Sequence, residues 1–356
     1  MKIAVIGGGN IGTLLAAEFA FSGFETYVYT SKPESWKKEI TVLSNNDDVL
    51  FRTDKVHVTA SLEAALTGSE QIWITYPSFM FGSLCKKMLP FVRRGTAVVV
   101  VPGSGGAEFS FLPLINAGCI LCGLQRVHCI TRLKQYGESV YMLGKKEEVF
   151  VGTIPSCESS YYAEILSKML NMPCKPLKNY LTVTLTPSNP ILHTSRLFAM
   201  FNGYEEGVFY DRNILFYEEW NDFSSDVMLK CDSELQRLCN TIDLDLSMVK
   251  SLKDHYESST KEQMTAKIKS IIAFKGLLSP MKMVSDNWVP DFSSRYFTAD
   301  FAYGLKVICD IAHLFCVDIP NIERVWNWYY KTAHLTDKSF FVLPSIDKEE
   351  FVDIYR

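Results

Sequence analysis

The sequence lacks an apolar run long enough to cross a membrane. Its longest candidate, Ala97–Val101, is far shorter than the roughly 20 apolar residues that a membrane-spanning helix needs. The early apolar stretch Ile3–Ile6 is too short for a signal peptide and ends in glycines. An excess of positive charge is also missing, because 36 Lys and Arg against 40 Asp and Glu give a net charge of −4, which argues against a dedicated nucleic-acid surface. We therefore expect a soluble, cytoplasmic protein that binds neither a membrane nor nucleic acid.

Cysteine patterning is also missing, although the chain contains ten cysteines. Only Cys119 and Cys122 form a C-x-x-C pair, and this pair lies in an apolar stretch without a second pair or a nearby histidine. Scattered thiols are typical of a reducing compartment. Packing in the core explains the pair better than zinc does. We therefore predict no metal site.

Two folding patterns divide the 356 residues, a length that favours two domains. In the first half, apolar strands alternate with helical segments, which is typical of a parallel sheet. From Asn189 onward, one helical pattern follows another. The sequence therefore predicts an α/β fold, with an N-terminal Rossmann-type doubly wound sheet over residues 1–184 and an all-helical C-terminal domain over residues 185–356.

The expected elements can be placed along the chain. Strands are expected at Lys2–Ile6, Thr26–Tyr29, Val56–Thr59, Gln71–Thr75, Thr96–Val101 and Cys119–Gly123, followed by a hairpin over Ser139–Thr153 and short strands at Cys174–Leu177 and Leu181–Thr184. Helices of the first domain are expected at Asn10–Phe21, Ser61–Leu66, Ser78–Leu89, Glu108–Ile115 and Ser159–Leu170. Those of the second are expected at Asn213–Trp220, Asp222–Asn240, Ser247–His255, Lys261–Ile272, Ala299–Phe315 and Asn321–His334.

The N-terminus carries a glycine-rich turn between the first strand and the first helix. It reads Gly7-Gly8-Gly9-Asn10-Ile11-Gly12, a G-x-G-x-x-G motif in the βαβ context that a dinucleotide requires. Gly7 permits the tight turn, Gly9 permits close approach of a pyrophosphate, and Gly12 permits close packing of helix and strand. We expect Gly7, Gly9, Asn10, Ile11 and Gly12 to bind the cofactor.

An acidic residue is missing where NAD-dependent enzymes usually have one. The second strand is followed by Thr30, Ser31 and Lys32, whereas an acid at this place would accept hydrogen bonds from the ribose 2′-hydroxyl. Two hydroxyls and an ammonium group suit a 2′-phosphate. The alternative is that Lys32 is an ordinary solvated lysine. The sequence favours NADP slightly over NAD, with Thr30, Ser31 and Lys32 as the residues at the ribose.

Two motifs in the second half contain candidate catalytic residues. The first, Asn189-Pro190-Ile191-Leu192-His193, has the pattern of a helix start with Asn as N-cap and Pro as the first helical residue. His193 would then lie in the first turn, where the helix dipole disfavours the imidazolium. A histidine that cycles its proton near neutral pH would therefore need a carboxylate partner. The alternative is a histidine that only packs locally.

The second motif runs from Ser294 to Leu305 and contains Arg295 and Asp300. Thr298 can cap a helix in whose first turn Asp300 would lie, which by itself gives Asp300 a purely structural explanation. Arg295 can present a planar fork to a carboxylate. Its alternative is a surface ion pair.

Taken together, these motifs resemble the opine dehydrogenases, the octopine/nopaline dehydrogenase family. That family combines a G-x-G-x-x-G domain with an N-P-x-x-H segment and a later R-Y-x-x-x-D-x-x-Y-G-L segment, and all three occur here in order. Gly123-Leu124-Gln125, Arg132 and Tyr136-Gly137 also look like the family's middle region. The resemblance covers nearly the whole chain.

The resemblance implies roles for the candidate residues. His193 and Asp300 would form the catalytic dyad, with the free imidazole nitrogen facing the nicotinamide. Arg295 would hold a substrate carboxylate, and we place Asn189 among the substrate-binding residues. The implied reaction is a reductive condensation of a 2-oxo acid with an amino acid amine, through an imine that takes hydride from NADPH or NADH. The expected partners are these small molecules, and a homodimer is compatible with the sequence.

Two other functions remain open at this point. The first is a ketopantoate-type or β-hydroxyacid dehydrogenase that reduces a simple 2-oxo acid. Such enzymes typically use a lysine of the helical domain, whereas Lys178 precedes that domain here. The second is a cofactor-binding sensor that has lost catalysis, although both dyad residues are present. The sequence does not indicate which amino acid or oxo acid is used.

Overall fold

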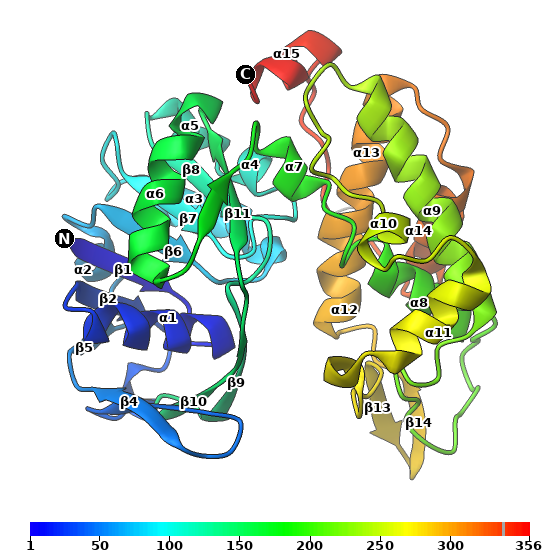
Figure 1. The fold of residues 1–356 in the computed structure, drawn as a ribbon, viewed down its shortest axis with the longest axis horizontal. Coiled ribbons are helices and arrows are strands. Elements are labelled where there is room, and N and C mark those ends of the chain that lie inside the picture. Colours follow the sequence, from blue (N-terminus) through cyan, green and yellow to red (C-terminus); the bar gives the residue numbers. More distant parts are fainter. Residues whose placement is uncertain (337–338) are drawn as a thin grey trace. The chain divides into compact units, whose positions relative to one another are not determined.

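The computed structural model describes residues 1–336 and 339–356 (Figure 1). The chain forms two compact units. The first comprises Met1–Thr184 together with Asp353–Arg356, and the second comprises Leu185–Val352. We expected the second domain to run to residue 356. The last four residues pack with the first unit instead, because the Tyr355 hydroxyl donates to the buried carboxyl of Glu108 at 2.9 Å.

The first unit is built on an eight-stranded sheet of order β12-β11-β8-β7-β6-β1-β2-β5. Neighbouring strands are parallel except β8 and β11, which are antiparallel. The strands are β1 Lys2–Ile6, β2 Glu25–Tyr29, β5 Val56–Thr59, β6 Gln71–Ile74, β7 Ala97–Val100, β8 Ile120–Leu124, β11 Val149–Ile154 and β12 Cys174–Pro176. This sheet confirms the predicted Rossmann-type α/β fold, whose ligands bind at the carboxyl ends of the strands.

The helices of the first unit alternate with these strands. They are α1 Asn10–Phe21, α2 Leu62–Leu66, α3 Phe81–Met88, α4 Ala107–Ser110, α5 Leu112–Asn116, α6 Ser159–Leu170 and α7 Leu181–Thr184, with short 3₁₀ turns η1 Pro33–Ser35, η2 Ser78–Met80 and η3 Ser156–Glu158. The strand predicted at Leu181–Thr184 is wrong. The Asn179 side chain accepts hydrogen bonds from the amide and hydroxyl of Thr182, which starts a helical turn despite the β-branched residues.

A second, four-stranded sheet in this unit was not predicted. Its order is β4-β3-β10-β9, formed by β3 Ile40–Leu43, β4 Val49–Thr53, β9 Cys129–Gln135 and β10 Ser139–Lys145. The predicted hairpin of Ser139–Thr153 is therefore wrong. β10 pairs with β9 and β3, whereas β11 pairs with β8 and β12. β11 is buried along most of its length and belongs in the large sheet, whereas β10 is buried at its first two residues and partly or fully exposed after them.

Helix α1 is buried against both sheets. Leu15 and Phe19 join the core cluster of the large sheet, and Leu14 and Ala17 pack in the cluster of the small sheet. A helix that is apolar on most of its circumference has to be covered on most sides. The small sheet covers a second side of α1. It therefore fixes the helix that begins at the dinucleotide motif.

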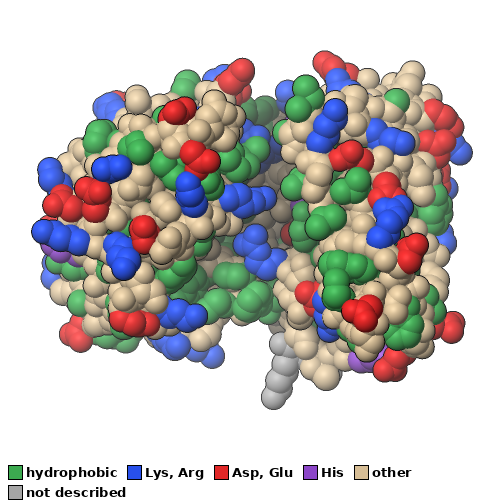
Figure 2. Space-filling model, turned by 90° about the horizontal axis from the view of Figure 1, so that it is seen from below, with side chains coloured by type: hydrophobic (Ala, Val, Ile, Leu, Met, Phe, Trp, Pro, Cys, Tyr) green, Lys and Arg blue, Asp and Glu red, His purple; other side chains and the backbone are tan. Residues whose placement is uncertain are grey.

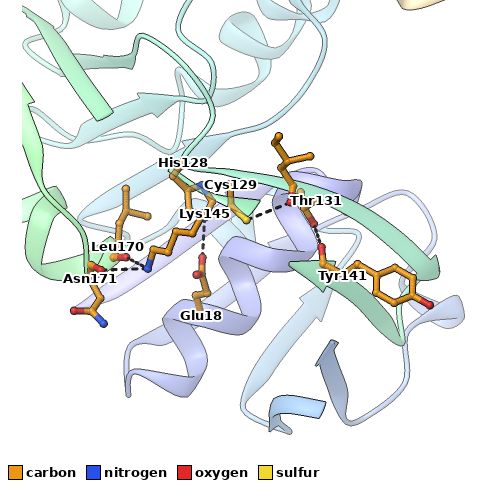
Figure 3. A network of polar contacts seen from close by, with 9 residues as sticks. Glu18, His128, Cys129, Thr131, Tyr141, Lys145, Leu170 and Asn171 are labelled. Carbon is orange, nitrogen blue, oxygen red and sulfur yellow. Dashed lines mark hydrogen bonds and ion pairs between the residues drawn. The ribbon is translucent and has the colours of Figure 1, made fainter. Parts of the chain in front are cut away.

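Polar contacts fix the same arrangement (Figure 3). Glu18 on α1 reaches His128, whose Nε2 lies 2.9 Å from a carboxylate oxygen although the His128 side chain is fully buried. Lys145, at the end of β10, donates to the carbonyls of Leu170 and Asn171 at 2.7 and 3.2 Å, at the end of α6. The small sheet is thus tied to α1 and α6.

The second unit is largely helical, as predicted. Its elements are α8 Leu192–Phe201, α9 Asp222–Thr241, α10 Leu252–His255, α11 Lys261–Ser270, η4 Ile272–Phe274, α12 Arg295–Thr298, the π-helix η5 Asp300–Leu305, α13 Lys306–Phe315, α14 Pro320–Thr332 and α15 Lys348–Asp353, together with strands β13 Met281–Val284 and β14 Asn287–Pro290. The β13–β14 hairpin departs from the all-helical expectation.

The helix predicted at Asn213–Trp220 is wrong. These residues form turns, and the side chain of Arg196 holds them by donating to the carbonyls of Phe216 and Glu219. Since a side chain satisfies these buried carbonyls, the segment needs no helical ladder.

Basic and acidic side chains are interspersed on the visible face of each unit (Figure 2). Within the described part of the chain, no helix is both long and apolar enough to span a membrane.

Candidate active site

The glycine-rich turn has the geometry that a dinucleotide needs. Gly7 has φ +117°, and an added Cβ there would lie 2.7 Å from the Thr75 hydroxyl. A Cβ at Gly12 would lie 1.8 Å from the Gly7 carbonyl oxygen, so helix and strand can only be this close with glycine. A Cβ at Gly9 would meet no described atom within 4 Å.

The open space at Gly9 lies at the start of α1. No side chain of the described residues caps this helix, and its first turn contains no acid. Free amides and the positive end of the helix dipole favour a diphosphate there. The residues present therefore fit a nicotinamide dinucleotide, with the amides of Asn10, Ile11 and Gly12 as the groups available to its phosphates.

The three residues after β2 differ in their surroundings. Ser31 and Lys32 are exposed, whereas Thr30 is buried and its hydroxyl lies 2.6 Å from that of Tyr136. Thr30 Oγ1 also accepts a weaker hydrogen bond from the Lys32 amide at 3.3 Å. Only Ser31 and Lys32 are thus free to approach a ribose substituent with their side chains.

Leu133 of β9, Tyr136 of the turn that follows β9, and Trp36 lie against the dinucleotide motif. The Leu133 amide donates to the Asn10 side chain at 2.8 Å, and a Cβ at Gly8 would meet Trp36 at 2.7 Å and the Tyr136 hydroxyl at 3.2 Å. Sequence reasoning did not assign Trp36 and Tyr136 to the cofactor site. The available signal was Tyr136-Gly137, which looked like the family's middle region but had no stated role.

In the second unit, His193 and Asp300 are brought together across 107 residues. Nδ1 of His193 lies 2.8 Å from Oδ2 of Asp300, and each side chain is 15% exposed. Asp300 begins the π-helix η5, a kind of helix that is common at functional sites. The two motifs also touch, since a Cβ at Gly304 would lie 3.0 Å from Cβ of Pro190.

The local structure around His193 differs from the expected helix start. α8 begins at Leu192, and the structure shows no side-chain cap there. Asn189 is exposed in the preceding turn, and its carbonyl accepts from the His193 amide at 3.1 Å. The prediction of Asn189 as N-cap is therefore wrong. Thr298 likewise does not cap, because its hydroxyl donates back to the Ser294 carbonyl.

Tyr217 is a residue of this site that sequence reasoning missed. Its hydroxyl lies 3.0 Å from Nε2 of His193, the nitrogen that we expected to be free. The rings of Phe216 and Tyr296 pack against the imidazole, at centroid distances of 5.6 and 4.8 Å. Tyr217 lies in the segment for which a helix was wrongly predicted, so its position could not be inferred from periodicity.

Arg295 is the first residue of α12 and is exposed. Its guanidinium forms no ion pair with any residue in 1–336 or 339–356, so the surface ion pair considered as its alternative is not seen there. Over the same residues, no cluster of His, Cys, Asp and Glu side chains could hold a metal ion. A planar guanidinium that is exposed in this way can bind an anion such as a carboxylate.

Comparison with known proteins bears on both units. The family model described as "NAD/NADP octopine/nopaline dehydrogenase, alpha-helical domain" matches residues 176–333. Residues 2–105 match the model described as "NAD-dependent glycerol-3-phosphate dehydrogenase N-terminus". The chain is 26% identical to tauropine dehydrogenase of Arabella iricolor, over 92% of this chain and 90% of the relative. It is also 26% identical to octopine dehydrogenase of Mizuhopecten yessoensis, over 92% and 89%.

Solved structures share the fold. An octopine dehydrogenase with NADH and L-arginine superposes with a TM-score of 0.82 at 24% identity, over 96% of this chain and 92% of that one. A yersinopine dehydrogenase with NADP⁺ gives 0.67 at 12% identity, over 99% and 97%. The family models cover the two parts of the fold, and the curated relatives match along nearly the full length. The chain belongs to the opine dehydrogenase family of NAD(P)-dependent oxidoreductases.

Proposed function

We propose that this protein catalyses the reductive condensation of a 2-oxo acid with the amine of an amino acid. The observation that carries the proposal is the 2.8 Å contact between His193 Nδ1 and Asp300 Oδ2. The exposed Arg295 lies five residues before Asp300 in the sequence. An acid–base pair and an anion-binding fork are what an oxo acid substrate requires.

His193 is the proposed proton carrier. The Asp300 carboxylate can only accept a hydrogen bond, so it fixes the imidazole proton on Nδ1 and leaves Nε2 for exchange with the substrate. It also favours the charged ring once Nε2 takes up a proton. Nε2 would give a proton to the substrate oxygen during condensation and take one back in the oxidative direction.

Arg295 is the proposed carboxylate site. Its planar guanidinium can donate two parallel hydrogen bonds to the oxo acid, and Asn189 would add an exposed amide to the substrate-binding residues. The nicotinamide, when bound, supplies the hydride that reduces the C=N bond. In the first unit, the amides after Gly9 would hold the diphosphate, and Ser31 and Lys32 would approach a 2′-phosphate, so we propose NADPH as the preferred reductant.

The test is a matrix of 2-oxo acids crossed with amino acids, followed by the absorbance of NADPH and of NADH. We expect oxidation of the cofactor to require both substrates in the same reaction. Each oxo acid is also assayed without an amine, because oxidation under that condition would instead indicate a plain 2-oxo acid reductase.

Thermal unfolding provides a check that does not depend on the choice of substrates. Binding of NADPH or NADH at millimolar concentration should stabilise the protein. The absence of stabilisation by both cofactors would overturn the proposed function as a whole. Cofactor stabilisation without turnover in the full matrix would instead support a cofactor-binding sensor.

A further inference from the structure

The imidazole of His193 is held at both of its nitrogens. Nδ1 contacts Asp300 at 2.8 Å, and Nε2 contacts the Tyr217 hydroxyl at 3.0 Å. The proposed reaction uses Nε2 for proton exchange. The group that contacts Nε2 in the free protein therefore affects this proton exchange directly.

The direction of the Tyr217 hydrogen bond follows from its surroundings. Burial raises the pKa of Tyr217 well above its usual value, and Tyr296, Tyr256 and Asp300 add to the effect. The hydroxyl therefore keeps its proton. Since Asp300 accepts from Nδ1, the neutral imidazole has its lone pair on Nε2, and Tyr217 donates to that lone pair.

Aromatic packing limits where this hydroxyl can go. Tyr217 is 5% exposed, and its ring stacks on Phe274 with a centroid distance of 4.0 Å and on Trp220 at 6.3 Å. A buried ring that stacks on two others loses little further freedom when its hydroxyl forms a hydrogen bond. The hydroxyl is thus preorganised toward Nε2.

Arg196 holds the chain on either side of Tyr217. Its guanidinium donates to the carbonyl of Phe216 at 2.9 Å, to the carbonyl of Glu219 at 2.9 Å and to the hydroxyl of Ser224 at 3.0 Å. Arg196 is 2% exposed and stands three residues after His193 on α8, so both side chains lie on the same side of that helix. One helix face therefore sets the positions of both the imidazole and its tyrosine partner.

We propose that Tyr217 is a positioning residue for the reaction, whose hydroxyl donates to Nε2 of His193 in the free protein and gives way to a substrate at that nitrogen. This inference rests on the proposed function. In the oxidative direction, the O–H or N–H bond of the substrate breaks and an N–H bond forms at Nε2, while the O–H bond of Tyr217 stays intact. The substrate takes over a hydrogen bond that already exists, so the imidazole keeps its orientation throughout.

The test is Tyr217→Phe, which removes the hydroxyl and keeps the aromatic stack. The titratable side chains around the imidazole are Asp300 of η5, Tyr296 of α12 and Tyr217 itself, and only the last is changed. Loss of a donor to the neutral ring favours its protonation. We expect the acid limb of the kcat/KM profile for opine oxidation to move up by about 0.5–1 pH unit, which is the typical worth of one hydrogen bond.

The same shift should be visible without any substrate. The proton NMR titration of the imidazole is followed in the free protein, and the His193 signal among the six histidines is the one missing from His193→Gln. Tyr329→Phe is the matched control, because it removes another buried tyrosine hydroxyl in the same unit, from a ring that packs on Phe297 and Phe301. An upward shift in Tyr217→Phe alone supports the proposal.

Two outcomes would overturn the role of Tyr217. One is a titration midpoint that stays within about 0.2 pH unit of the unmodified protein, since one lost hydrogen bond should move it further. The other is an equal shift in Tyr329→Phe, which would indicate a general change of the fold. Failure of the proposed function has a different signature, namely no turnover with any substrate pair while the NMR shift of Tyr217→Phe is still present.

Discussion

At the scale of single residues, the proposed reaction depends most on the pair of His193 and Asp300. A positioned acid–base group contributes about 10²–10⁴-fold to a rate. We expect His193→Ala to lower kcat by that factor and to leave stabilisation by NADPH unchanged, because the dinucleotide motif belongs to the other unit. Asp300→Asn should also lower kcat, since an amide cannot provide the charge that favours the imidazolium. Steady-state kinetics together with thermal unfolding measure both effects.

The control for the dyad is again Tyr329→Phe, which should behave as the unmodified protein. A His193→Ala variant with near-normal kcat would show that His193 only packs in the helical unit. A normal kcat in Asp300→Asn alone would mean that Asp300 has only a structural role, as the first residue of η5.

Arg295→Lys tests the carboxylate site. A point charge replaces a planar fork, so one of two parallel hydrogen bonds is lost. We expect the KM for the oxo acid to rise by roughly tenfold or more, as for the loss of one charged hydrogen bond, while the KM for the cofactor stays constant. Arg237→Lys is a suitable control, because Arg237 is exposed in the same unit and its guanidinium donates to the Asp318 carbonyl. An unchanged KM in Arg295→Lys would mean that the carboxylate is bound elsewhere.

Residues of the site differ in how far their sequence signals could identify them. His193 and Asp300 stand in short motifs with family-like spacing, so their contact could be anticipated although 107 residues separate them. Tyr217 has no such motif. Its place depends on hydrogen bonds from the buried Arg196 to backbone carbonyls, and no periodicity of the sequence encodes a bond of that kind.

At the scale of elements, the proposed preference for NADPH rests on the end of β2. Lys32 is exposed there beside Ser31, and its charge would favour a 2′-phosphate. Lys32→Asp should raise the KM for NADPH by about tenfold through repulsion and should affect NADH little. The ratio of the two kcat/KM values measures the preference. Lys55→Asp is the control, because Lys55 lies at the opposite end of the neighbouring strand β5, and it should leave the ratio unchanged. An unchanged ratio in Lys32→Asp would mean that Lys32 is merely solvated.

The segment between α8 and α9 depends on one side chain. Burial lowers the pKa of Arg196 to about 10, and the attraction of Glu219 opposes this effect. Arg196→Lys keeps the charge but cannot serve three acceptors in one plane, so buried carbonyls lose their donors. We expect a loss of about 2–4 kcal/mol of unfolding free energy, because each unsatisfied group costs about 1–3 kcal/mol. Urea unfolding measures it, and Arg237→Lys is the control. An equal stability in both variants would contradict the argument.

At the scale of the whole molecule, the pattern of strands and helices was sufficient to predict both domains. The second sheet escaped prediction because β3 and β4 are short, and because β3 joins the sheet by pairing with β10, where Thr41 lies opposite Ser139. Alternation along a strand indicates that one face is buried, but it does not indicate which sheet the strand joins. The hairpin of β10 and β11 failed for this reason.

The first unit should lose stability as the pH rises from weakly acidic to neutral, because of one buried carboxyl. Glu108 is fully buried, and its Oε1 accepts hydrogen bonds from Thr184 at 2.6 Å and from Tyr355 at 2.9 Å. One group thus holds both the last residue of the Met1–Thr184 segment and the returning C-terminus. Burial raises the pKa of Glu108 from 4.5 to about 7, although these hydrogen bonds oppose the shift.

The sign of the effect follows from proton binding. The folded protein holds the proton of Glu108 up to about pH 7, whereas the unfolded chain releases it near 4.5. The folded state therefore binds more protons between these values, and the stabilisation present below pH 4.5 is lost as the pH rises to 7. Such a shift corresponds to at most about 3 kcal/mol. Glu108→Gln keeps an acceptor for Thr184 and Tyr355 but cannot ionise, so its stability should depend less on pH. Relative to the unmodified protein, the variant should therefore be more stable at pH 8 than at pH 5.

Thermal unfolding of both proteins at pH 5, 6, 7 and 8 measures this difference. Glu147→Gln makes the same chemical change at an exposed position of the same unit, and its stability should follow that of the unmodified protein at each pH. An equal stability difference between Glu108→Gln and the unmodified protein at all four pH values would contradict this expectation. In that case the Glu108 carboxyl would be ionised or neutral to the same extent in the folded and unfolded chains. The hydrogen bonds of Thr184 and Tyr355 would then hold the two chain segments without any contribution from its protonation.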